Sequence, residues 1–287
     1  MAKTIGNPLS WTVGAFGSVL GHGSAAVRSV GGVDGVPAAE PVIRSLSTED
    51  LKTALRKGWS DVQAFRSDVV FVCLLYPVIG GLLVAMALQG NLVHLLFPVV
   101  SGFALTGPVA AVGLYEMSRR REAGLETGWA ALFDVIRSPR FGSVLALALM
   151  HAVIFMAWIM AANLIFDITI GPEVPPTAAA FAQAVFGTAA GWAMAVIGMA
   201  VGFVFAVLVL VFSVVSFPML LDRDVSLPVA VKTSVAVAGK NPVVIATWGL
   251  IVAGSLALGS IPALVGLVLV LPVLGHATWH LYRAAVG

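Results

Sequence analysis

The sequence has few charged residues and a single cysteine. Only 10% of its 287 residues are Asp, Glu, Lys or Arg, whereas a soluble globular domain carries about 25%. Cys73 stands alone, which excludes an internal disulfide framework and a paired-thiolate metal site. The chain also lacks a Walker-type phosphate loop, a His-Glu-x-x-His zinc motif and a Gly-x-Ser-x-Gly nucleophile elbow. These absences exclude an ordinary soluble domain and argue against most enzymes.

Long apolar runs separate the clusters of charged residues. Hydrophobic residues make up 59% of the chain, and the mean hydropathy is +1.00. A membrane span takes about 20 apolar residues, and every backbone amide in hydrocarbon needs an internal partner, so apolar spans must be helices. The sequence therefore predicts an all-α fold, a polytopic membrane helix bundle with six transmembrane helices in three hairpins. The expected spans are 69–89, 92–115, 143–166, 189–221, 243–258 and 261–282.

The basic residues divide the predicted topology into two sides. All sixteen Lys and Arg residues lie in the clusters 3–66, 119–140 and 223–240 or at Arg283, which the six spans place on one side. Only the acidic Asp167 and Glu173 fall on the other. Basic loops mark the cytoplasmic side, so both termini are expected in the cytoplasm, with residues 1–43 as a flexible tail and 44–287 as the membrane domain. Basic side chains at membrane borders predict contact with anionic lipid rather than with nucleic acid.

An amphipathic segment precedes each predicted hairpin. In the first, Ser47 and Asp50 have capping-box spacing, and Leu51, Leu55, Trp59, Val62 and Phe65 then recur on one helical face. Comparable segments cover 129–136 and 227–238. These segments are expected to lie in the membrane interface. The sequence thus predicts an internal repeat of three units, each an interfacial helix, an outward span and an inward span.

Three histidines are candidates for binding a cofactor. His276 and His280 are four residues apart and share a helix face, and His151 is expected at a similar depth. Imidazole suits both haem and metal ions, so these residues could hold haem. However, no carboxylate stands beside them in the sequence to orient their rings. The alternative is that His276 bonds a neighbouring helix and His280 lies at the headgroups, so that no cofactor is expected.

Other polar residues also have both a functional and a structural interpretation. Asp222, Arg223 and Asp224 resemble an acidic metal-binding pair, but they also suit a helix end with a local ion pair. Glu116 lies three and four residues before two arginines, the spacing of a solvated helix extension. Asn163 lies within a predicted span, where an amide usually bonds another helix.

Three stretches carry a resemblance to a known family. They are Gly113-Leu114-Tyr115-Glu116 through Arg120, Leu220 through Val225, and Leu271-Pro272 through Arg283. Over roughly residues 44–284 the chain resembles the bacterial domain of unknown function 2189 family of predicted integral membrane proteins. Some members carry the label putative cytochrome c oxidase subunit, so the resemblance implies a bacterial inner membrane and a respiratory neighbourhood. It implies no catalytic residues.

Three functions are compatible with these observations. The first is a non-catalytic inner-membrane scaffold or accessory subunit that packs against other membrane proteins or respiratory complexes. The second is a carrier or channel for a neutral or apolar solute, and the third is a haem- or metal-binding redox protein. No unpaired charged residue falls at the middle of a predicted span, which argues against a charge-coupled pump.

Overall fold

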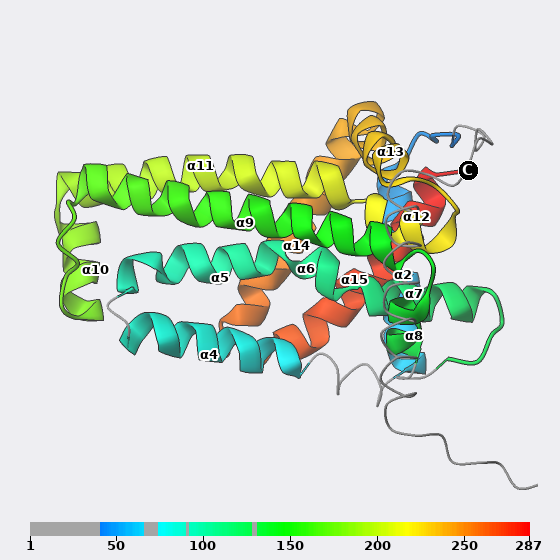
Figure 1. Ribbon diagram of the computed structural model, residues 1–287, viewed down its shortest axis with the longest axis horizontal. Coiled ribbons are helices and arrows are strands. Elements are labelled where there is room, and N and C mark those ends of the chain that lie inside the picture. Colours follow the sequence, from blue (N-terminus) through cyan, green and yellow to red (C-terminus); the bar gives the residue numbers. More distant parts are fainter. Residues whose placement is uncertain (1–40, 66–73, 90–91, 128–130) are drawn as a thin grey trace, which may run out of the picture.

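The computed structural model describes residues 41–65, 74–89, 92–127 and 131–287, and these residues form a bundle of helices (Figure 1). In chain order the helices are α2 (Thr48–Ala64), α4 (Leu75–Gln89), η1 (Val93–Leu95), α5 (Leu96–Leu105), α6 (Gly107–Ala110), α7 (Val112–Glu122), α8 (Ala131–Arg137), α9 (Phe141–Thr169), α10 (Ala178–Gly187), α11 (Ala189–Ser213), α12 (Ser216–Asp222), α13 (Leu227–Lys240), α14 (Pro242–Ser260) and α15 (Leu267–Ala285). The predicted all-α class is confirmed. Nearly all of the expected tail, residues 1–40, lies outside the described residues.

The helices form a long body with a different layer at each end. Helices α4, α5, α9 and α11 run along the body (Figure 1). At one end α10 crosses beside η1, the last turns of α9 and the first turns of α11; we call this the far end. At the opposite end α2, α7, α8, α12, α13 and the C-terminal half of α15 gather. We call this layer the basic end, because every described Lys and Arg lies in these helices or in the chain next to them.

Among the described residues, three helices are long and apolar enough to cross a membrane. They are Phe141–Thr169, Ala189–Asp222, which joins α11 to α12, and Pro242–Ser260. The apolar helices Leu75–Leu88 and Val93–Leu105 are shorter. The structure therefore supports three of the six expected spans by length and composition, whereas the six-span count and its three hairpins remain a prediction.

Two expected spans are interrupted or begin later than the sequence indicated. The run 92–115 divides into η1, α5, α6 and α7, with Pro108 in the first turn of α6. Proline has no N–H and cannot continue the hydrogen-bond ladder of a preceding helix. In the run 261–282, Ala263 and Leu264 have φ angles of 50° and 67°, which place them in the left-handed region. Consequently α15 begins at Leu267.

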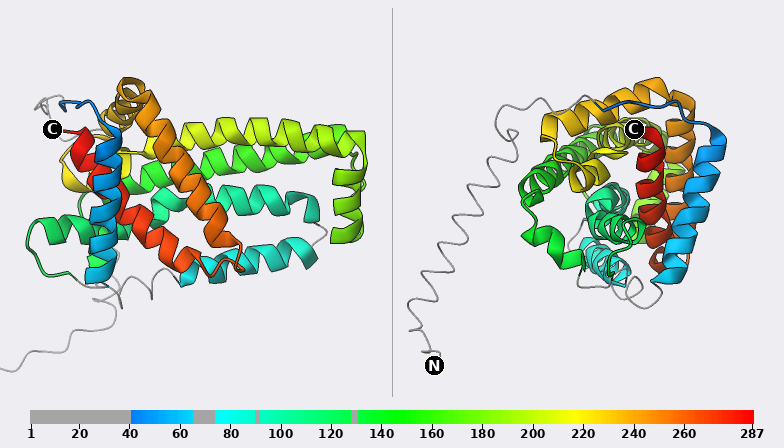
Figure 2. Two further views of the ribbon diagram at one scale, coloured as in Figure 1. Left: turned by 180° about the vertical axis from the view of Figure 1, so that it is seen from behind. Right: turned by 90° about the vertical axis from the view of Figure 1, so that its right-hand side faces the viewer.

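Helix α2 lies across the body and packs on α15, as the rear view in Figure 2 shows. Its capping box is present, as predicted, with Asp50 bonding back to Ser47. Its buried residues, however, are Leu51, Ala54, Gly58, Asp61 and Val62, while Trp59 is 44% exposed. The face that contacts protein is therefore turned away from Trp59 and includes a carboxylate that the predicted apolar stripe did not contain.

A glycine allows this close packing. A Cβ atom placed on Gly58 would lie 2.7 Å from the backbone nitrogen of Ala277 and 2.9 Å from its Cα. Backbone atoms this close leave no room for a side chain, because neither helix can yield locally. Gly58 therefore sets the separation at which α2 crosses α15.

Candidate functional site

A buried polar cluster forms where α2, α7 and α15 meet at the basic end. Asp61 comes from α2, Ser118 and Arg121 come from α7, and His276 and His280 come from α15. We call these five residues the Asp61 cluster. His276 is 0% exposed, Ser118 1% and Asp61 3%. Three helices from distant parts of the sequence thus place their polar groups together in the protein interior.

Asp61 is the acceptor at the centre of this cluster. Its Oδ1 atom accepts a short hydrogen bond from Arg121. Its Oδ2 atom accepts from Ser118 Oγ at 2.6 Å and from His280 Nε2 at 2.9 Å. Ser118 Oγ also lies 2.7 Å from Nδ1 of His276. A carboxylate therefore does lie beside His276 and His280, and it is Asp61. The sequence interpretation that no carboxylate orients these rings is wrong.

The donor and acceptor capacities of these groups assign the protons within the cluster. An ionised carboxylate only accepts hydrogen bonds, so the single hydroxyl proton of Ser118 points to Asp61. Nδ1 of His276 must then donate to Ser118 Oγ. In the neutral ring this leaves Nε2 as a lone pair, and Nε2 is buried without a hydrogen-bond partner among the described residues.

Two opposing effects act on the pKa of Asp61. Burial favours the neutral acid and alone would raise the pKa. Hydrogen bonds from His280 and Ser118, together with the charge interactions of the two histidines, stabilise the carboxylate and outweigh burial. The pKa of Asp61 is therefore below its ordinary range, and the group is ionised at neutral pH.

A second group of ion pairs connects α7 to α8. Glu116 is 5% exposed and receives hydrogen bonds of 2.8 Å from Arg119 and Arg120. Arg120 also donates to Asp134 of α8 at 2.8 Å. Glu116 thus has the predicted i,i+3 and i,i+4 partners, but it is not on a solvated helix extension. It is a buried carboxylate whose two guanidinium partners neutralise it.

The residues at the end of α12 connect to α15. Asp222 Oδ2 accepts from the hydroxyl of Tyr282 at 2.7 Å and from Arg283 at 3.1 Å. Arg223 donates to Tyr282 and to the carbonyl of Gly287, and it also lies 3.9 Å from Asp222. Asp224 is exposed. Within the described parts of the chain, no three His, Cys, Asp or Glu side chains are grouped to hold a metal ion.

The other two candidate residues lie in separate environments. His151, on α9, is 2% exposed; its Nδ1 atom bonds the carbonyl of Leu147 at 2.9 Å, and its ring packs 5.2 Å from that of Phe217. It shares no partner with His276 or His280. Asn163 lies near the far end, where its amide bonds His94 at 3.1 Å and Asp167 at 2.9 Å. The predicted trio of histidines is thus not brought together.

Asp61 and Ser118 were not recognised from the sequence. A signal for Asp61 does exist, because it follows Gly58 by three residues and Ala54 by seven and so falls on the same helical face. A charged residue on a helix face of small and apolar residues indicates a buried partner. Nothing in the sequence identifies that partner, which lies 57 residues away in the case of Ser118 and 219 in the case of His280.

The fold and the polar end layer define an α-helical integral membrane protein. A family model described as Predicted integral membrane protein (DUF2189) matches residues 96–222, which confirms the resemblance read from the sequence. The match is shorter than the expected 44–284 and includes neither α2 nor α15. No curated protein and no solved structure matches the chain.

Proposed function

We propose that the protein is a non-catalytic membrane scaffold or accessory subunit that holds a partner protein against its apolar spans. The observation that carries this proposal is that the carboxylates at the basic end bond other side chains of the protein. Asp61 and Asp222 accept hydrogen bonds from side chains of other helices, and Glu116 neutralises two adjacent arginines of its own helix. Such contacts stabilise helix packing, and they occupy the groups that a catalytic site would need free.

The exposed surface of α11 supports the same proposal. In the most apolar part of Ala189–Asp222 only 6% of residues are buried, against 22% in each of the other two candidate spans. Of the three candidate spans, this helix is therefore the one that the rest of the protein covers least. In a membrane an uncovered apolar face packs against lipid or against helices of another protein.

The arrangement at the basic end is also consistent with a threefold repeat. Viewed along the body, α2, α8 and α13 surround α7, α12 and α15 (Figure 2, right). Each outer helix precedes a predicted hairpin, and each inner helix ends one. We propose three units of one kind in a bacterial inner membrane, with the basic end in the cytoplasm and next to anionic lipid.

A labelling experiment tests this topology. In a Cys73→Ala background, cysteine replaces either Glu173 in the exposed loop before α10 or Thr127 after α7. The Glu173→Cys variant should react with an impermeant maleimide added to intact cells, and Thr127→Cys should react only after permeabilisation. Labelling of both from the same side would contradict the crossing by α9, and the reverse pattern would contradict the proposed orientation.

Photo-crosslinking tests the scaffold function. A photoreactive amino acid replaces Phe203 on α11, which is 67% exposed, or Leu250 on α14, which is 72% exposed. Because α11 is the least covered of the three candidate spans, Phe203 should give one dominant protein adduct, identified by mass spectrometry, and Leu250 should give mainly lipid adducts. If neither site crosslinks to protein and the chain purifies alone from mild detergent, the scaffold proposal is wrong.

A further inference from the structure

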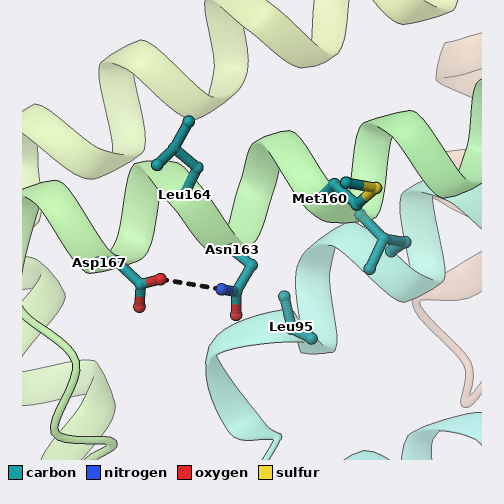
Figure 3. A pocket seen from close by; sticks show the side chains of 6 residues that line it. Leu95, Met160, Asn163, Leu164 and Asp167 are labelled. Carbon is teal, nitrogen blue, oxygen red and sulfur yellow. Dashed lines mark hydrogen bonds between the residues drawn. The ribbon is translucent and has the colours of Figure 1, made fainter.

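An open pocket lies near the far end, on a face of α9. Its volume is about 370 Å³, and it is lined by Leu95, Ile159, Met160, Asn163, Leu164 and Asp167. Five of these residues lie on two turns of α9, and Leu95 reaches toward them from η1 (Figure 3). The lining is apolar except at Asn163 and Asp167. The pocket therefore combines an apolar wall with one polar, negatively charged edge.

The polar edge has a defined hydrogen-bond order. Nδ2 of Asn163 donates to Oδ2 of Asp167 at 2.9 Å, as Figure 3 shows. The amide oxygen of Asn163 is therefore the acceptor for His94 Nε2 at 3.1 Å. His94 is held in turn by stacking on Phe166, with ring centroids 4.4 Å apart. Asn163 thus positions the Asp167 carboxylate beside the pocket.

The charge of Asp167 has no cationic partner within the described structure. No Lys or Arg occurs between Arg140 and Arg223, or between Arg66 and Arg119, so the segments that build the far end contain none. At the basic end, by contrast, Asp61, Glu116 and Asp222 each have an arginine partner. Asp167 is exposed, and among the described residues no cationic side chain pairs with it, so it presents a negative charge to its surroundings at the edge of an apolar wall.

We propose that this pocket binds a primary ammonium group attached to an apolar body, with Asp167 as its counter-ion and Asn163 as the positioning residue. The ammonium group supplies the missing positive charge and three hydrogen-bond donors. Leu95, Ile159 and Met160 accommodate the apolar part. An anion would be repelled, and a neutral apolar molecule would form no charge-assisted hydrogen bond with Asp167. The same chemistry occurs in a free amphiphilic amine and in the headgroup of an aminophospholipid.

Binding of dodecylamine to the full-length protein in phosphatidylcholine nanodiscs tests the proposal. Saturable binding is expected, with dodecanol binding at least about tenfold more weakly, since the alcohol brings no positive charge to the Asp167 carboxylate. The Asp167→Asn variant should lose about tenfold in affinity for the amine. Glu173→Gln, which changes a nearby exposed carboxylate in the loop after α9, should bind as the wild type does.

Two further arms separate the sources of the ligand and guard against misfolding. If phosphatidylethanolamine in the nanodisc competes with dodecylamine, the site takes a lipid headgroup; if it does not, the site takes a free amine. Asp167→Lys should gain binding of dodecyl sulfate, a result that a misfolded protein could not give. Equal binding of amine and alcohol by the wild type, or unchanged amine affinity in Asp167→Asn, would overturn the proposal.

Discussion

Replacing Asp61 with Asn should lower the free energy of unfolding by about 3 kcal/mol at neutral pH. The side chain is 5% exposed and accepts bonds from Arg121, Ser118 and His280. Breaking a buried ion pair typically costs about 3–5 kcal/mol, and the lower value applies because Arg121 is 38% exposed and can still reach water. Thermal or denaturant unfolding of the protein in detergent measures the loss.

The pH dependence of this loss has a definite sign. Because the pKa of Asp61 is lower in the folded protein, its contribution is present above the unfolded carboxyl pKa of about 3.9. It is lost as the pH falls through the lower, folded pKa. The stability difference between wild type and Asp61→Asn should therefore persist from pH 7 to pH 5 and shrink below about pH 4.

Glu49 on the same helix supplies the matched control. Its carboxylate is 69% exposed and pairs with Lys52, which is 72% exposed. Such surface pairs contribute about 0–1 kcal/mol, so Glu49→Gln should change stability little. If Asp61→Asn lowers the free energy of unfolding by less than about 0.5 kcal/mol, the Asp61 cluster stabilises the fold no more than a surface ion pair does. That result would contradict its structural role.

Replacing Gly58 with Ala should destabilise the protein by about 1–3 kcal/mol, the usual cost of inserting a methyl group into a packed interface. The new Cβ would meet the backbone of Ala277 at 2.7–2.9 Å. Alanine is the better helix former by about 1 kcal/mol, so the steric effect must exceed that gain. The same unfolding measurement shows whether the steric cost exceeds the gain in helix propensity.

Two comparisons make the Gly58 result specific to backbone contact. On α13, a methyl group added at Gly239 would have nothing within 4 Å of it, so Gly239→Ala should be neutral or slightly stabilising. Adding Ala277→Gly to Gly58→Ala should not restore stability, because the nitrogen and Cα of residue 277 remain in place. Recovery in the double variant would show that the two methyl groups, and not the crossing of α2 over α15, cause the clash.

The separation of charge from apolar sequence was readable without any structure. Arginines and lysines cluster between apolar runs, so they must gather where those runs end, and the structure places the described ones together at the basic end. The helical class follows from the same pattern because apolar spans need internal hydrogen bonds. The capping box at Ser47 and Asp50 was also predictable, since both partners lie within one turn.

The contacts of the candidate site could not be derived in this way. His276 and His280 share a helix face by spacing alone, yet their common carboxylate comes from α2, more than 200 residues earlier in the case of His280. Glu116 looked solvated because its local partners are arginines, but packing of the surrounding helices buries it. Burial and partner choice are properties of the packed helices, and local spacing contains neither.

Apolar length, helical period and the clustering of basic residues are local properties, so the sequence by itself determined an α-helical membrane protein with one basic side. Tertiary structure decided that Asp61 joins Ser118 and His280, that His151 stands apart, and that Asp167 borders an apolar pocket. The physical reason is that a helix sets which side chains share its own face, whereas the crossing of separate helices sets which of those faces meet.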